Sequence, residues 1–195
     1  QFSRRISADS YMNTVGARID YSLTSRTQLF AMDEYSLREY EYGFDISKNR
    51  TAGGIKQNIT SQVSCTAMAG IDFIDAQSDY TKPLLSFSLT DQIDEATQLE
   101  LSYVKEYALS QYQEDCFNSW QTQAKFSKQP WQRLRYSLGL FYGEGKYVSA
   151  AFSDDFIGCD MSVDYSLNKN ADIVLAYAFS KVMSDDKERE YTKNR

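Results

Sequence analysis

The feature that most constrains this chain is a period of two in its hydrophobic residues. From residue 157 to residue 167, every odd position carries Ile, Cys, Met, Val, Tyr or Leu, and the positions between them carry glycine, aspartate and serine. Such alternation gives one apolar and one polar face and is typical of a β-strand. A second apolar segment, residues 173–179, follows after the short polar stretch 168–171. The two segments therefore predict a β-hairpin.

The same alternation recurs along the whole chain. We expect ten strands, near residues 12–23, 28–37, 51–59, 63–73, 85–89, 99–107, 120–126, 134–142, 157–167 and 173–179. Short turns near residues 25, 61, 93, 129 and 169 alternate with longer polar loops, so the repeating unit is one hairpin. A propeller blade would need four strands within about 40 to 50 residues. Because no linker or composition shift interrupts the 195 residues, we predict one all-β domain, residues 1–195, built as an antiparallel up-and-down barrel.

The medium around this barrel follows from its two faces. Mean hydropathy is only −0.53, but a membrane-spanning strand needs about 9 to 11 residues with every second one apolar, so a transmembrane β-barrel is compatible with that value. The polar phase mixes small residues with charges of both signs, as expected for a lumen. Aromatic residues of the apolar phase gather near strand ends, as in the girdles at lipid–water interfaces: Tyr21, Tyr35, Phe73, Tyr103, Tyr107, Phe126, Tyr142, Tyr165 and Phe179. The alternative is a soluble β-sandwich or a lipocalin-like barrel.

The two ends of the chain predict a larger barrel. Ten strands joined by five short turns put both ends on the long-loop side, whereas bacterial single-chain barrels usually begin and end at their short periplasmic turns. Residues 191–195 look like the start of another strand, and residues 2–6 like the end of an earlier one. We therefore expect a domain truncated at both ends, belonging to a barrel of at least twelve strands.

One set of residues, mostly in the C-terminal third, carries a resemblance to a known family. The set comprises Phe152, Asp155, Ile157, Gly158, Asp164, Tyr165, Ser166, Leu167, Leu175, Ala176, Tyr177, Glu190, Tyr191, Thr192, Lys193 and Asn194. In this pattern the chain resembles the outer-membrane β-barrel porins found with bacterial exopolysaccharide export systems. The resemblance implies a bacterial outer-membrane location, with outer-membrane lipid, polysaccharide and proteins of the export system as partners. Barrels that sheathe multihaem cytochromes have a similar strand pattern and remain an alternative.

The residue types present argue against several kinds of chemistry. The chain has no histidine. The enzymatic outer-membrane barrels resemble one another in relying on a histidine as a base or as an orienting group. The net charge of −6 without a basic cluster excludes nucleic acid as a partner. Three cysteines without metal-type spacing predict neither a disulfide framework nor a metal site, and we expect no cofactor.

Charged residues on the polar phase are the candidate functional residues. We expect twelve to face the lumen: Arg18, Asp20, Glu34, Lys56, Asp72, Glu100, Glu106, Lys125, Arg133, Arg135, Asp160 and Asp164. Two of the carboxylates could face each other as an acid–base pair, as in a glycosidase, but a solvated lattice of ion pairs is the favoured interpretation. Trp120 and Trp131 are expected either to anchor the barrel at the lipid interface or to stack on sugar rings.

The sequence thus predicts a non-enzymatic outer-membrane β-barrel for the porin-like passage or export of a hydrophilic solute, with polysaccharide as the expected solute. Selectivity would depend on the charge and the bore of the lumen. Two alternatives stay open. One is a structural or scaffold barrel such as a cytochrome sheath, and the other is a soluble β-barrel or sandwich that binds a ligand.

Overall fold

The chain folds into a single antiparallel sheet in which every strand pairs with the next one along the sequence. The computed structural model describes residues 10–40, 45–75, 79–109, 116–147, 153–168, 171–184 and 191–194. The strands are β1 (Ser10–Ser22), β2 (Thr27–Tyr40), β3 (Ile46–Asn58), β4 (Val63–Asp75), β5 (Tyr80–Asp94), β6 (Thr97–Leu109), β7 (Cys116–Trp131), β8 (Leu134–Tyr147), β9 (Ser153–Asn168), β10 (Ala171–Ser184) and β11 (Tyr191–Asn194). Their order in the sheet is the order in the sequence. The all-β, up-and-down prediction is confirmed.

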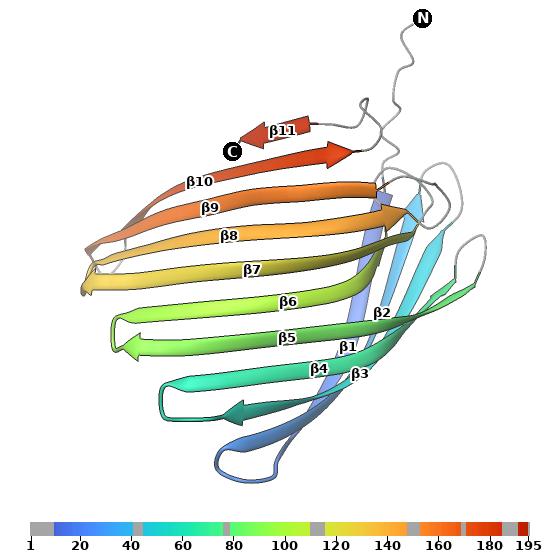
Figure 1. The fold of residues 1–195 in the computed structure, drawn as a ribbon, viewed down its shortest axis with the longest axis horizontal. Helices are drawn as coiled ribbons and strands as arrows, with labels where there is room; N and C mark the ends of the chain where they lie inside the picture. Colours follow the sequence, from blue (N-terminus) through green and yellow to red (C-terminus); the bar gives the residue numbers. More distant parts are fainter. Residues whose placement is uncertain are drawn as a thin grey trace, which may run out of the picture.

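The sheet curls, so that it has a concave and a convex face. In Figure 1, β1 and β2 turn back behind β4 and β5, and the short β3–β4 and β5–β6 turns lie at the same end of the strands. Within the described residues, β1 and β11 are the two edges of the sheet. The same part of the chain contains no helix that is long and apolar enough to cross a membrane.

The pairing register fixes which residues share a face, because successive side chains in a strand point to opposite sides. The concave face carries the even-numbered residues of β1–β6, β9 and β10 and the odd-numbered residues of β7 and β8. The change of parity follows from even–odd pairs such as Glu100 with Lys125 and Gly139 with Asp160. Concave positions such as Ile46, Leu84 and Asp72 are almost fully buried by the curl.

Most strands are longer than predicted, and the differences in β3, β5 and β7 change the place of particular residues. β3 begins at Ile46, five residues before the predicted start, because the polar residues between them continue the alternation. β5 begins at Tyr80, so Pro83 lies inside the strand, opposite Ile71, and not in a loop. β7 continues through the predicted turn to Trp131, with a register irregularity between Lys128 and Trp131 that accommodates a proline in a strand. The short segment β11 confirms the expected strand start near residue 191.

Candidate functional site: the concave face

Four charged residues of alternating sign lie side by side across β2–β5 on the concave face. Glu34 is the direct cross-strand partner of Arg50, Arg50 is the partner of Asp72, and Asp72 is the partner of Lys82. Opposite charges at directly paired positions stabilise neighbouring strands. These four residues form a charged seam toward the end of the sheet opposite the short turns.

Arg50 is the centre of this seam. Its Nε donates to Oδ1 of Asp72 at 2.8 Å and its Nη2 to Oδ2 at 3.1 Å, while Nη2 also lies 2.7 Å from Oε2 of Glu106. The side chains of Arg50 and Asp72 are 12% and 0% exposed, so this bidentate pair is shielded from water. Because Glu106 belongs to β6, the guanidinium reaches across β5 and ties three strands together.

Lys82 ends the seam beside two aromatic rings. Its Nζ lies 5.5 Å from the ring centre of Tyr80 and 5.2 Å from that of Tyr107, within the range of cation–π attraction. Tyr107 is only 8% exposed. By register Tyr107 has the convex phase of β6, opposite Asn118, but its ring lies near Lys82 and is largely covered. The last β5–β6 pair joins Leu85 to Lys105, and beyond this pair the tyrosine packs against the lysine.

A second group of charges lies nearer the short turns and is arranged differently. Glu100 is directly opposite Lys125, and Lys125 is opposite Gly139. The carboxylate of Asp160 lies over Gly139, where a side chain on that glycine would collide with it. Within the described residues, Glu100, Lys125 and Asp160 form no ion pair, since no oppositely charged nitrogen and oxygen atoms of these side chains come within 4.0 Å. These side chains therefore remain available to a solute.

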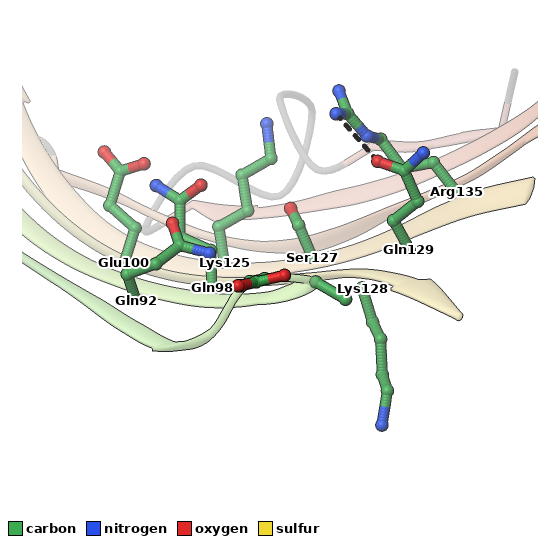
Figure 2. A pocket seen from close by; sticks show the side chains of 10 residues that line it. Gln92, Gln98, Glu100, Lys125, Ser127, Lys128, Gln129 and Arg135 are labelled. Atoms are coloured by element: carbon green, nitrogen blue, oxygen red, sulfur yellow. Dashed lines mark hydrogen bonds between the residues drawn. The ribbon is translucent and has the colours of Figure 1, made fainter. Parts of the chain in front are cut away.

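The same end of the face is hollowed into a polar depression of about 370 Å³. Figure 2 shows Gln98, Glu100, Lys125 and Arg135 projecting from one side of the sheet, whereas Lys128 projects from the other. Nη2 of Arg135 donates to Oε1 of Gln129 at 3.5 Å, a long and weak hydrogen bond. Amides and charges, not apolar groups, thus dominate this depression.

Between the charged groups, small hydroxyl and amide side chains cover the concave face of β5–β9. The register gives this phase to Ser86, Ser88, Thr90, Ser102, Ser119, Gln121, Gln123, Ser127, Ser137 and Ser162. Two of them, Ser137 and Ser162, form a hydrogen bond between their hydroxyls at 3.0 Å. The surface can both donate and accept hydrogen bonds along its length.

The other predicted residues lie apart from these two groups. Arg18 and Asp20 pair with each other on β1, with Nη2 and Oδ1 2.9 Å apart. Lys56 lies opposite Gln28 and Thr66. Arg133 lies in the β7–β8 turn, where its carbonyl accepts a hydrogen bond from the N–H of Ser166.

The last two of the twelve predicted residues are Arg135 and Asp164, which lie directly opposite each other across the β8–β9 pair. Glu34 and Asp72 belong to the charged seam, and Glu106 joins it through Arg50. None of the seven predicted carboxylates, all of which are described, lies directly opposite another. Nor do the described residues bring three or more carboxylates or thiols together in a group that would hold a metal ion.

Three basic residues on the concave phase, Lys48, Arg50 and Lys82, were not among the predicted lumen residues. Each fell into a predicted loop, because β3 and β5 were expected to begin too late. The signal was present, since Lys48 and Arg50 continue the even phase of the third strand backward from Ala52. Loop assignments based on polarity alone conceal residues of this kind.

The convex face is apolar and widely exposed. Among its large side chains, Ile71 is 44%, Leu140 54% and Leu175 67% exposed. Aromatic clusters lie toward both ends of the strands. Trp120 stacks with Tyr103 at 6.3 Å and meets Tyr142 edge-on at 5.6 Å, measured between ring centres. Near the short turns, Phe126 packs against Tyr136 at 6.2 Å.

The two tryptophans do not lie on the concave face. Trp120 has the convex phase of β7, where its Nε1 donates to Oε2 of Glu144 at 3.3 Å. Trp131 follows the register irregularity at the end of β7, pairs with Leu134 of the convex phase and is 69% exposed. Of the two expected roles, anchoring at an interface fits these positions better than stacking on a solute in the lumen.

The arrangement of strands is that of known outer-membrane channels. The outer membrane channel DcaP of Acinetobacter baumannii superimposes with a TM-score of 0.63 at 17% sequence identity, over 92% of this chain and 59% of the channel's chain. The KdgM porin matches with a TM-score of 0.42 at 10% identity, over 95% of this chain and 93% of the porin. The match to DcaP shows the fold of this chain.

The other comparisons add no family. No protein-family model matches this chain, and no curated protein matches its sequence. The chain spans 59% of the length of the channel that it resembles. The link to exopolysaccharide export therefore rests on the sequence resemblance alone.

Proposed function

We propose that this chain forms part of the wall of a bacterial outer-membrane β-barrel that passes a hydrophilic solute without chemical change. Its convex face meets lipid and its concave face lines a polar passage. The observation that carries the proposal is the contrast between the two faces of one curled sheet. One face presents exposed leucine, isoleucine and tyrosine, and the other presents hydroxyls, amides and charges.

The height of the apolar band supports the lipid contact. On the convex face of β9, apolar side chains run from Ile157 to Leu167. Ten steps of about 3.4 Å, tilted by about 35–45°, give a band of roughly 25 Å, which is the height of the outward apolar band in outer-membrane barrels. Aromatic clusters toward both ends of the strands resemble the girdles at the two interfaces.

Polysaccharide is the solute class that we propose. A sugar polymer offers many hydroxyl groups, and the concave face of β5–β9 offers matching hydroxyl and amide partners with few large apolar side chains between them. Glu100, Lys125 and Asp160, which form no ion pair among the described residues, add hydrogen-bonding groups that face the same passage. Proteins of an export system are the proposed partners at either end.

The test is single-channel conductance of the full-length protein in planar bilayers. We expect steady ion currents, together with a requirement for detergent during extraction. A protein that dissolves in aqueous buffer as a compact monomer would refute the membrane location and favour a soluble ligand-binding barrel. A bilayer-inserted protein without current would refute the passage function.

A second candidate function is a structural or scaffold barrel, such as a sheath around a cytochrome. The observation that favours it is the buried network of Arg50, Asp72 and Glu106, which ties three strands together on the concave face. In that case the inserted protein carries no current, and replacement of Lys125 by glutamate leaves its behaviour unchanged. In the passage function, the same replacement shifts ion selectivity toward cations.

A further inference from the structure

Two phenylalanine rings lie across two glycines on the concave face of β8 and β9. Phe141 of β8 is the direct partner of Gly158 of β9, and Phe156 of β9 is the direct partner of Gly143 of β8. A Cβ atom on Gly158 would collide with the ring of Phe141, and one on Gly143 with the ring of Phe156. Each ring therefore leans over the neighbouring strand, and the two occupy adjacent rows of the register, about 7 Å apart.

The outer faces of these rings are accessible. Phe141 and Phe156 are both half-buried, whereas the glycines beneath them are buried. A third pair of the same kind shows the difference. The ring of Phe30 lies over Gly54 but is only 6% exposed, and the guanidinium of Arg18 covers it, with Cζ 4.0 Å from the ring centre. Phe30 fills space in the wall, while Phe141 and Phe156 leave a flat apolar surface uncovered.

Polar groups that can bind hydroxyls border this surface. Gln123 is the β7 partner of Phe141, and Gln121 is the β7 partner of Gly143. In the next row toward the short turns, the carboxylate of Asp160 lies over Gly139. A flat apolar surface edged by amides and a carboxylate matches the chemistry of a pyranose ring, which has an apolar C–H face and a rim of hydroxyls. Sites of this composition hold small ligands through apolar contact and a few placed polar groups.

We infer that Phe141 and Phe156 form a binding site for pyranose rings, with Gln121, Gln123 and Asp160 as the hydrogen-bonding partners of the sugar hydroxyls. This inference rests on the proposed passage function and specifies where on the wall the sugar is held. The site would hold a passing glycan for a finite time, one ring after another, without forming a covalent bond.

The test measures how long a sugar blocks the channel. Full-length protein in planar bilayers is exposed to maltohexaose and, as a reference, to polyethylene glycol of the same hydrodynamic size. We expect resolved blockades with the sugar and none of comparable duration with the polymer. The double variant F141L/F156L keeps apolar volume but loses the flat faces, and we expect its blockades to be about tenfold shorter. The pair F141Y/F156Y should retain the duration of the parent.

Two controls separate binding from packing. F30L alters the covered ring and should leave the blockade time unchanged. Q121A/Q123A removes polar partners of the sugar without disturbing the Phe–Gly packing and should shorten the blockades. This variant tests the site even if F141L/F156L does not assemble. Unchanged blockade times in a conducting F141L/F156L or Q121A/Q123A variant would overturn the site.

A titration of the detergent-solubilised protein with maltohexaose distinguishes failure of the site from failure of the passage function. Sugar binding that F141L/F156L abolishes, in a protein that carries no current, would overturn the passage function and support the site. Currents without sugar binding or blockades would support the passage and overturn the site. The absence of both would overturn both.

Discussion

Charged residues on the concave face differ in whether the protein itself satisfies them. The Arg50–Asp72 pair is buried and bidentate, and Glu106 completes the coordination of the guanidinium. Glu100, Lys125 and Asp160 lie close together in the register but form no ion pair within the described residues. The first group is suited to holding the wall together, and the second to meeting a solute.

Removing the arginine should therefore cost stability. In the variant Arg50→Met, the fully buried carboxylate of Asp72 loses its charge partner, and we expect the free energy of unfolding to fall by about 3–5 kcal/mol. The measurement is urea-induced unfolding of the protein in lipid vesicles. The matched control is Arg18→Met, whose solvent-exposed pair with Asp20 should contribute little to the free energy of unfolding. Similar losses in the two variants would contradict a structural role specific to Arg50.

Two adjacent glycines test the packing of the same wall. A Cβ on Gly54 would collide with the ring of Phe30 and approach the carbonyl oxygen of Ala67 to 2.6 Å, whereas a Cβ on Gly53 meets only one carbonyl oxygen, at 3.6 Å. We expect Gly54→Ala to destabilise the protein by about 1–3 kcal/mol and Gly53→Ala to change it by less than about 0.5 kcal/mol. The shift in thermal unfolding followed by circular dichroism checks both, and equal shifts would argue against the ring position.

At the residue level, the sequence predicted which face of the sheet a side chain lies on better than it predicted which residues that side chain contacts. Period-two alternation assigned Asp72 and Glu106 to the polar phase, because that property is local. It did not show that one guanidinium joins them, because β6 reaches Arg50 only through the curl of the sheet. Nor did composition reveal that Phe141 and Phe156, which break the alternation, lie flat over glycines on facing strands.

The short turns show how local hydrogen bonds end the strands. In the β1–β2 turn, Oγ1 of Thr24 accepts hydrogen bonds from the N–H groups of Arg26 and Thr27, at 3.1 and 3.0 Å. In the β3–β4 turn, Oγ1 of Thr60 accepts from the N–H groups of Gln62 and Val63, at 3.1 and 2.9 Å. The two turns are therefore the same structure, built from Thr-Ser followed by two residues.

Loss of this hydroxyl should loosen one hairpin. Thr60→Val retains the shape of the side chain but removes the acceptor of two backbone hydrogen bonds, and we expect a loss of about 0.5–1.5 kcal/mol in the free energy of unfolding. Thr60→Ser keeps the oxygen and should remain near the parent. Urea unfolding of the three proteins in vesicles provides the comparison. A serine variant as unstable as the valine variant would show that the methyl group, not the hydroxyl, matters.

Turns of this kind explain which strand ends the sequence could predict. The first two turns were expected near residues 25 and 61, and they occur there because the threonine signal is local. β7 runs past its predicted turn, since the irregularity between Lys128 and Trp131 tolerates Pro130 inside the strand. The start of β3 depends on pairing with β2 and β4, and the only local sign of it is the even phase of Lys48 and Arg50 within a polar stretch.

For the whole molecule, the decisive property is that the two faces of one sheet differ in chemistry. The concave face carries hydroxyl, amide and charged groups beside a few buried apolar residues such as Ile46 and Leu84, whereas the large apolar groups of the convex face are exposed, the reverse of a soluble domain with a packed apolar core. This inversion follows if the outer medium is hydrocarbon and the inner one is water.

Neighbouring residues of β7 test this separation directly. Ala124 lies on the convex face between Leu101 and Leu140, and Gln123 lies on the concave face between Ser102 and Phe141. We expect Ala124→Arg to lower the free energy of unfolding in vesicles by about 2–4 kcal/mol, because it puts a charge into hydrocarbon near the middle of the band. Gln123→Arg should cost less than about 1 kcal/mol, because its guanidinium stays in the aqueous passage.

The comparison is informative because both substitutions introduce the same residue, with the same charge, into neighbouring positions of the same strand. The proportion of protein that assembles in the vesicles should fall with the free energy of unfolding for Ala124→Arg and stay near the parent for Gln123→Arg. Gln123→Arg should instead reduce the current carried by cations, since it adds a positive charge to the wall of the passage. Equal destabilisation of the two variants would mean that both faces meet the same medium, and the assignment of lipid outside and water inside would then be wrong.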